Sequence, residues 1–250
     1  MLGMSEENPR FDDEFGSTYV LISPGTYQMG NPTTNSPKRE LPSHEIEISQ
    51  PFFLGKMQVT QIQWQSVMGD NPAKFSEGWS AGLRPIESVS WDDVQVFIEK
   101  LNTLHNDSPK LGLYGKWRLP SESEWEYAAR AGTLSRWSFG DMDAELNEYG
   151  WHAGNSGAST REVGQKKANP WGLHDLHGNV SEWCLDDWSS NYENTPIDQS
   201  PMTISGETRK SHRGGNWFTE SDSTRCSARG FSQRNIAKDG IGIRLVWQPN

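Results

Sequence analysis

The sequence predicts an α+β fold that is rich in loops and low in regular secondary structure. Only 33% of the 250 residues are hydrophobic and the mean hydropathy is -0.78, which is too little for a core of long apolar stripes. The chain also contains 12 Trp, 24 Gly and 14 Pro. Indole rings bury large areas from few positions, whereas Gly and Pro set irregular turns. We therefore expect scattered aromatic side chains to hold the core together.

Short strands are predicted in the first quarter of the chain. Residues 19–22 form an apolar run, and residues 24–30 look like a turn and a second strand, so the two are expected to make a hairpin. Residues 31–43 are rich in Asn, Pro, Ser and charge, which favours a loop. His44–Ile48 alternates polar and apolar residues, as a half-buried strand does.

Three helices are predicted from their N-terminal caps. Thr60 is the expected cap of a short helix that ends at Gly69. A longer helix after Ser90 has apolar residues at spacings of 3, 4 and 3, namely Trp91, Val94, Ile98 and Leu101. Ser121 opens a further capping box, before a short helix over residues 125–130 that Gly132 ends. Beyond residue 131 we expect turns and short apolar runs.

The chain is expected to be one domain. Residues 1–16 are polar and acidic and are predicted to be a flexible tail, and residues 17–250 contain no internal repeat or linker. The start lacks the basic-then-apolar layout of a signal peptide. The compartment therefore stays open: cytoplasmic as the sequence is written, or exported if a leader has been removed.

Net charge is the main evidence on partners. The formal charge of -10 disfavours nucleic acid and anionic membranes as partners, and it is compatible with cation binding. Soluble bacterial proteins often have similar surfaces. No stretch approaches the about 18 apolar residues that a membrane-spanning helix needs.

Several segments together carry a resemblance to a known family. They run in order over nearly the whole chain, at residues 22–30, 51–55, 59–60, 85–91, 117–130, 169–173, 178–183 and 214–217, the last reading Gly-Gly-Asn-Trp. In this pattern the chain resembles the formylglycine-generating enzyme (sulfatase-modifying factor) superfamily. The resemblance implies a divergent C-type-lectin-like fold, which agrees with the loop-rich prediction.

The resemblance also implies where copper chemistry would occur. In the enzymes of this family a cysteine pair after Gly-Gly-x-Trp binds copper. Here the first position falls on Thr219 and the second within Ser221 to Thr224, and hydroxyls cannot replace thiolates as Cu(I) ligands. Cys226 matches a structural cysteine of the family. We therefore expect no copper, no catalytic residues and no conversion of a Cys-x-Pro-x-Arg peptide. Whether Cys184 and Cys226 pair is left open.

A calcium loop is implied by the Gly-Asn-x-x-Glu turn. The positions that match the family's ligands are Asp175, Gly178, Val180 and Glu182. Calcium takes about six to eight oxygen ligands and accepts carbonyls readily. The alternative is that Glu182 only caps local backbone amides. No second calcium loop is recognisable around residues 155–157.

Iron is a further metal known in a related branch, which uses three His from a separate helical domain. This sequence shows no helical His bundle ahead of the fold, so an iron site of that kind is not expected. His174 and His177 are spaced i, i+3 on a turn, and we expect them to be surface or packing residues, because isolated His do not define a site.

The segment 216–239 is polar and aromatic, and rigid scaffolds often carry recognition on such loops. In some lectin-like relatives the same segment is the hypervariable ligand-binding region of diversity-generating retroelement systems. The expected ligand-binding residues are Trp217, Phe218, Thr219, Ser221, Asp222, Ser223, Arg229 and Phe231. An ordinary solvated loop is the alternative.

The leading functional prediction is a non-catalytic recognition protein. A protein or small-molecule ligand would bind at the surface of segment 216–239, with calcium holding the adjacent loop. Two alternatives are kept: a metal-dependent oxidoreductase of the same superfamily, and an accessory maturation factor.

Overall fold

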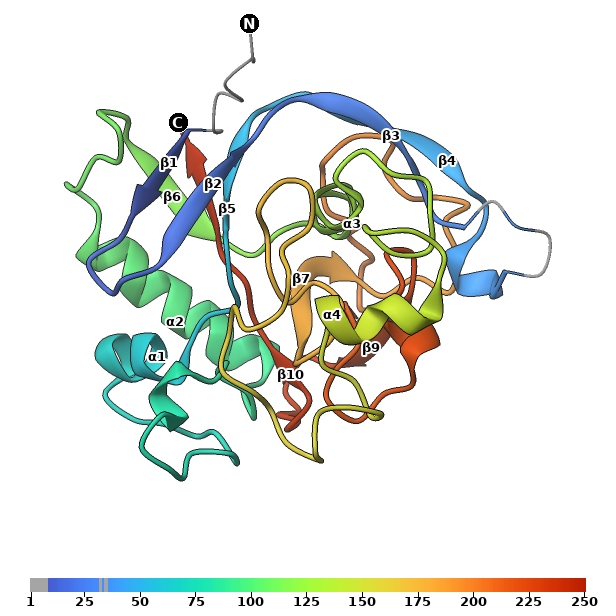
Figure 1. The fold of residues 1–250 in the computed structure, drawn as a ribbon. Helices are drawn as coiled ribbons and strands as arrows, with labels where there is room; N and C mark the ends of the chain where they lie inside the picture. Colours follow the sequence, from blue (N-terminus) through green and yellow to red (C-terminus); the bar gives the residue numbers. More distant parts are fainter. Residues whose placement is uncertain (1–8, 32, 34–35) are drawn as a thin grey trace, which may run out of the picture.

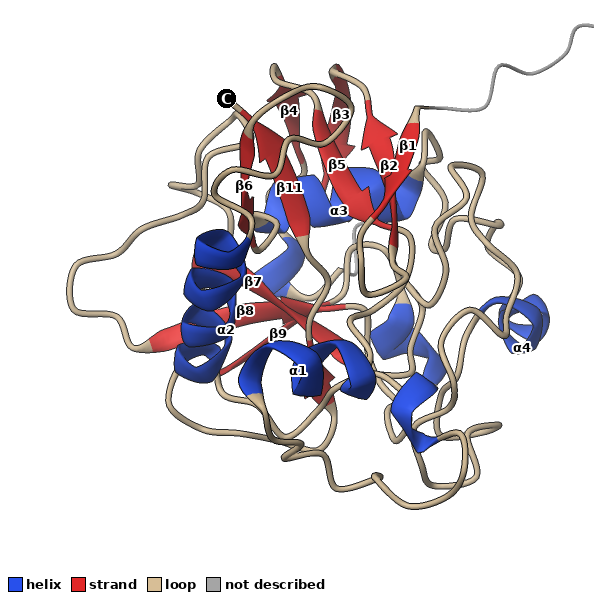
Figure 2. Cartoon of the chain, turned by 90° about the vertical axis from the view of Figure 1, so that its left-hand side faces the viewer, coloured by secondary structure: helices blue, strands red, loops and turns tan. Residues whose placement is uncertain are grey.

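Both ends of the described chain lie in one antiparallel sheet. The computed structural model describes residues 9–31, 33 and 36–250. The sheet has the order β1-β2-β5-β11-β6, and Figure 2 shows it as the upper layer of the molecule. Its strands are β1 (Arg10–Asp12), β2 (Thr18–Ile22), β5 (Phe52–Gly55), β11 (Val246–Pro249) and β6 (Gly115–Arg118). The C-terminal strand β11 lies between β5 and β6 and pairs with both, so it joins β6 to the rest of the sheet.

A second sheet carries the C-terminal half. Its order is β10-β7-β8-β9, with β10 parallel to β7 and the other pairs antiparallel. The strands are β7 (Ser181–Asp187), β8 (Arg209–Arg213), β9 (Arg229–Gln233) and β10 (Ile241–Gly242). A separate two-stranded ribbon consists of β3 (Gly25–Met29) and β4 (His44–Ile48). Figure 1 shows this ribbon extending away from the first sheet.

The three predicted helices are present with their caps. They are α1 (Gln61–Met68), α2 (Trp91–Leu104) and α3 (Glu122–Arg130). Thr60, Ser90 and Ser121 each close a capping box. Helix α3 packs on β7 and β8, and its C-cap is Ala131 in the left-handed region rather than Gly132. The remaining described helical turns are short: η1 (Lys38–Glu40), η2 (Ala81–Leu83), η3 (Asp143–Glu145), α4 (Leu146–Tyr149) and η4 (Ser221–Thr224).

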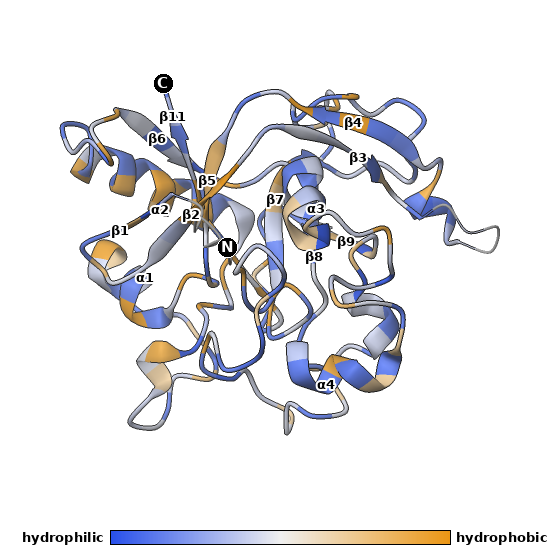
Figure 3. Cartoon of the chain, turned by 45° about the horizontal axis from the view of Figure 1, so that its top comes forward, coloured by the Kyte–Doolittle hydropathy of each residue, from blue (hydrophilic) through white to orange (hydrophobic). Residues whose placement is uncertain are grey.

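Aromatic side chains hold the core, as the composition predicts. Several indole rings are fully buried, among them Trp64, Trp125, Trp137, Trp183 and Trp247. Trp64 stacks on Phe97 with ring centroids 4.8 Å apart, which joins α1 to α2. Figure 3 shows hydrophobic residues as short stretches spread over several elements rather than as one continuous apolar element. The loop-rich α+β prediction is confirmed.

Two local predictions are wrong. Residues 19–22 and 24–30 do not form a hairpin, because β2 is an inner strand whose two edges pair with β1 and β5, while β3 pairs with β4. The predicted tail is wrong for residues 10–16, since β1 lies there and Phe11 stacks on Tyr19 with centroids 5.1 Å apart. Residues 1–8 of the predicted tail lie outside the described residues.

Candidate functional site

The second sheet and the loop that joins its strands β8 and β9 enclose a small polar cavity. The volume is about 130 Å³, and the walls include residues of β7, β8, β9, the Gly214–Gly215 turn and η4. Three of its lining residues carry hydroxyl groups, namely Ser181, Thr219 and Ser223. Thr219 and Ser223 are the positions where the resemblance places, or allows, the copper-binding cysteines. A hydroxyl-bearing residue thus stands where the resemblance places the first cysteine, at Thr219, and another, Ser223, lies within the range Ser221 to Thr224 that it allows for the second.

The turn at this cavity is built from backbone contacts that only glycine allows. Gly215 has a φ of +66°, and a Cβ there would lie 2.8 Å from the Ser223 carbonyl oxygen and 3.0 Å from Thr219 Oγ1. The Asn216 amide donates to Thr219 Oγ1 at 2.9 Å, and Thr219 Oγ1 donates to the Asn216 carbonyl at 3.1 Å. A side chain at position 215 would therefore push Thr219 and Ser223 out of place.

Arginines of the cavity wall are held in buried ion pairs. Arg225 forms two hydrogen bonds with Glu40, at 2.7 and 2.9 Å. Arg229 bonds Glu122 at 2.5 and 2.7 Å, and both residues are buried. Burial raises the pKa of Glu122 and Arg229 lowers it, and the net direction is downward, so the carboxylate stays charged. The guanidinium of Arg229, predicted to face a ligand, is committed to this pair.

An aromatic cluster borders the cavity. Trp217 packs edge-on against Phe75 and Phe218, with centroids 5.2 and 4.7 Å away, and its indole N–H donates to the Asp239 carbonyl. Phe218 is 51% exposed, so its ring is open to a partner. Phe231 is 45% exposed but lies on β9, where it stacks on Trp188 at 4.7 Å.

The predicted ligand-binding residues therefore divide into groups. Thr219, Asp222, Ser223 and Arg229 line the cavity. Trp217 and Phe218 form the aromatic cluster with Phe75, whereas Phe231 packs on Trp188. The hydroxyl of Ser221 donates to Asp143 at 3.2 Å.

Sequence reasoning missed several residues of the wall, namely Arg39, Ser181, His212 and Asn216. Ser181 and Asn216 stand inside the quoted family motifs, which could have pointed to them. His212 had no such signal, because only the pairing of β8 with β7 and β9 places it there.

The four predicted calcium ligands do come together, but around a side-chain amide. Gln58 Nε2 lies 3.2 Å from the Asp175 carbonyl oxygen, 3.2 Å from that of Gly178, 2.9 Å from that of Val180 and 3.0 Å from Glu182 Oε1. Gln58 is buried, and sequence analysis missed it. The oxygen set is of the kind that calcium accepts. As these residues stand, they fit an amide donor, and a calcium ion at this point would require Gln58 to move.

Cys184 and Cys226 are both buried and are not joined in a disulfide. Burial raises the pKa of the Cys226 thiol to about 12 and raises that of Cys184 well above its usual range. Both therefore stay protonated near neutral pH, and a thiol is a much poorer metal ligand and nucleophile than a thiolate.

The histidines predicted as packing residues have structural partners. His174 Nδ1 contacts the Lys166 carbonyl at 2.8 Å, and His177 is buried between Ser138 and Thr224. Within residues 9–31, 33 and 36–250, no group of three or more His, Cys, Asp or Glu side chains is arranged to hold a metal.

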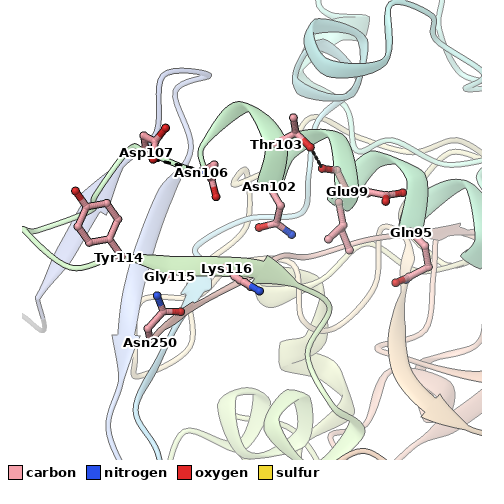
Figure 4. A pocket seen from close by; sticks show the side chains of 11 residues that line it. Gln95, Glu99, Asn102, Thr103, Asn106, Asp107, Tyr114, Gly115, Lys116 and Asn250 are labelled. Carbon is pink, nitrogen blue, oxygen red and sulfur yellow. Dashed lines mark hydrogen bonds between the residues drawn. The ribbon is translucent and has the colours of Figure 1, made fainter.

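A larger groove lies elsewhere, between α2 and the edge strand β6. Its volume is about 910 Å³, and polar side chains line much of it (Figure 4). Asn102 donates to the Trp117 carbonyl at 2.9 Å and accepts from the Trp117 amide at 2.7 Å. These bonds use the backbone groups through which another strand could pair with β6. The groove carries no candidate chemistry, and the cavity at η4 is the stronger site.

Comparison with known proteins decides the family. Residues 5–249 match the Sulfatase-modifying factor enzyme 1-like domain. The chain belongs to this family. The chaperone protein LppX of Paenibacillus barcinonensis is 31% identical over 237 residues, which cover 78% of this chain and 79% of that protein. The alignment thus covers most of this chain and most of LppX.

Two further relatives place the chain within the family. The formylglycine-generating enzyme of Mycobacterium tuberculosis is 36% identical over 165 residues, or 56% of this chain and 55% of that enzyme. The solved structure of Treponema denticola variable protein 1 superposes with a TM-score of 0.83 at 29% identity, covering 93% of this chain and 95% of that one. The resemblance predicted from the motifs is confirmed.

In the part of the chain that the structure describes, the helices are too short or too polar to cross a bilayer.

Proposed function

We propose that this member of the sulfatase-modifying factor family is a non-catalytic recognition protein whose segment 216–239 binds a protein ligand. One observation carries the proposal: Thr219 and Ser223 line the cavity beside the Gly-Gly-Asn-Trp turn. In the family's oxidases the residues at this turn are thiolates that hold Cu(I). Hydroxyl groups are poor ligands for that soft ion.

The two cysteines of the chain support this reading. Both are buried with raised pKa values, and neither lines the cavity. A thiol-based oxidation at the cavity would need a thiolate that reaches it.

The surface around the cavity is suited to contact with a protein. Phe218 and Phe231 are exposed aromatic rings, and Arg225 and Arg229, which line the cavity, are fixed by ion pairs with Glu40 and Glu122. Exposed aromatic side chains on a rigid base lose little entropy on binding and often dominate the binding energy.

The names of the relatives support the same class of function. Treponema denticola variable protein 1 has nearly the same extent and fold. LppX is named a chaperone, which favours the accessory maturation factor as a second candidate. Both candidates require a surface that contacts another protein, and we place it at segment 216–239 in either case.

Site-specific photo-crosslinking tests the proposal. The crosslinking amino acid p-benzoylphenylalanine replaces Phe218 or Phe231, and Ile197, which is 73% exposed and lies beside β4, serves as the control position. In extracts of the source organism we expect one defined protein to crosslink from positions 218 and 231 and not from position 197. Equal labelling from all three positions, or none from positions 218 and 231, contradicts a binding surface at this segment.

A further inference from the structure

We propose that the side-chain amide of Gln58 takes the place of the metal ion at the loop of residues 175–182, so that the chain folds without calcium. This inference is independent of the recognition function. It starts from the convergence of three backbone carbonyls and one carboxylate on Gln58 Nε2. Such convergence of oxygens on a buried point requires a positive or hydrogen-bearing centre, since the oxygens otherwise repel one another.

The distances match hydrogen bonds rather than metal coordination. Gln58 Nε2 lies 2.9 to 3.2 Å from its four acceptors. Hydrogen bonds from nitrogen to oxygen span about 2.7–3.2 Å, whereas calcium ligands lie at about 2.3–2.6 Å. The NH₂ group has two hydrogens, so each hydrogen is shared between two oxygens.

The charge of Glu182 is already balanced. Arg244 donates to Glu182 Oε1 at 2.8 Å and to Oε2 at 2.9 Å, and Trp125 Nε1 donates to Oε2 at 2.6 Å. With the bond from Gln58, each carboxylate oxygen accepts two hydrogen bonds, which uses the acceptor capacity of the group. Glu182 and Arg244 are both fully buried, so a cation added beside this pair would meet an existing positive charge.

The competing account is a calcium ion that displaces the amide. Two buried oxygens near the loop, Asp175 Oδ1 and Gln58 Oε1, have no hydrogen-bond partner among the described residues. A cation could take both as ligands if the Gln58 side chain turned. The two accounts differ in one measurable property, the effect of calcium on the wild-type protein.

Thermal unfolding of the wild-type chain in EDTA and in millimolar CaCl₂ tests the proposal. We expect the same Tm in both. Gln58→Ala removes the amide and leaves the oxygen cage, so its Tm should fall in EDTA and recover in part with CaCl₂. Gln63→Ala is the matched control, since Gln63 is also buried but belongs to the α1 capping box. Its loss of Tm should not respond to calcium. A wild-type Tm that drops in EDTA and is restored by CaCl₂ overturns the proposal.

A second measurement remains informative if Gln58→Ala does not fold. Tb³⁺ substitutes for calcium, and the indole of Trp125 bonds Glu182 directly, so an ion bound here would luminesce when the protein's tryptophan is excited. We expect no sensitised luminescence from the wild-type protein. Luminescence that saturates at one ion per chain and is removed by CaCl₂ contradicts the proposal.

Discussion

Single buried side chains fix the loops around the cavity. His177 is 2% exposed, and its Nδ1–H donates to the Thr224 carbonyl at 2.9 Å. Its Nε2 accepts from the Ser138 hydroxyl at 2.8 Å, so the ring is neutral. Burial lowers the pKa of His177 to about 4. This neutral ring ties the η4 segment to the interior, and charging it would place an N–H against the Ser138 amide, which also points at Nε2.

The lowered pKa of His177 predicts that the protein loses stability in mild acid. Its folded-state pKa of about 4 lies below the unfolded value, so the unfolded chain binds more protons between these pH values. The stabilisation is therefore complete above the unfolded value of about 6.5 and is lost as pH falls toward 4. Asp186 has the opposite effect on the pH dependence of stability. Burial, aided by Glu122, raises its pKa to about 7, so its stabilisation is lost as the pH rises.

The comparison of wild type with His177→Gln isolates this effect from that of Asp186. In urea unfolding, the difference in unfolding free energy between the two proteins should shrink by about 2 kcal/mol from pH 7.5 to pH 5. His44→Gln, which replaces a histidine at a half-exposed position, is the control substitution. A His177→Gln difference that is the same at both pH values contradicts the assignment.

At the scale of elements, local signals were predictable and strand pairing was not. Thr60, Ser90 and Ser121 were found as caps because a capping box is complete within four residues. The hairpin at residues 19–30 failed because the partners of β2 and β3 lie elsewhere in the chain. For the same reason Thr219 and Ser223 were predicted from one motif, whereas Gln58 and His212 were missed.

The cap of α3 has a measurable contribution. Ser121 Oγ accepts from the Glu124 amide at 3.1 Å, and Glu124 accepts from the Ser121 amide at 2.9 Å. Ser121→Ala should lower the unfolding free energy by about 1–2 kcal/mol in urea titrations. Ser66→Ala is the control, since the Ser66 hydroxyl is exposed and bonds only its own helix, and it should change stability little. Equal effects of the two substitutions would show that the cap is not stabilising α3.

The turn of residues 216–224 should accept a copper site when sulfur is supplied. Thr219 and Ser223 line one cavity, and Thr219 Oγ1 and the Ser223 backbone carbonyl oxygen both lie beside Gly215. The double variant Thr219→Cys/Ser223→Cys should bind one Cu(I) and retain it against a chromogenic chelator, since paired thiolates select this ion. The wild type and either single variant should lose the metal. A double variant that binds no better than the single variants would show that the two positions do not converge.

At the scale of the molecule, a rigid aromatic-held scaffold supports a surface of irregular loops. The composition predicted this architecture, because 12 Trp residues in a chain of low mean hydropathy leave few other ways to build a core. The motifs predicted the family, which residues 5–249 confirm. Ion pairs such as Arg225 with Glu40 were not predictable, since they join positions 185 residues apart in the sequence.

The central claim is that the cavity beside Gly-Gly-Asn-Trp serves recognition rather than copper-dependent oxidation. The most direct test incubates the wild-type protein with added copper and a Cys-x-Pro-x-Arg peptide under air and follows the peptide by mass spectrometry, with a formylglycine-generating enzyme as the positive control. Because Thr219 and Ser223 carry hydroxyls rather than thiols, we expect the peptide to stay unchanged. Formation of formylglycine by the wild-type chain, at a rate that depends on copper, would contradict the account.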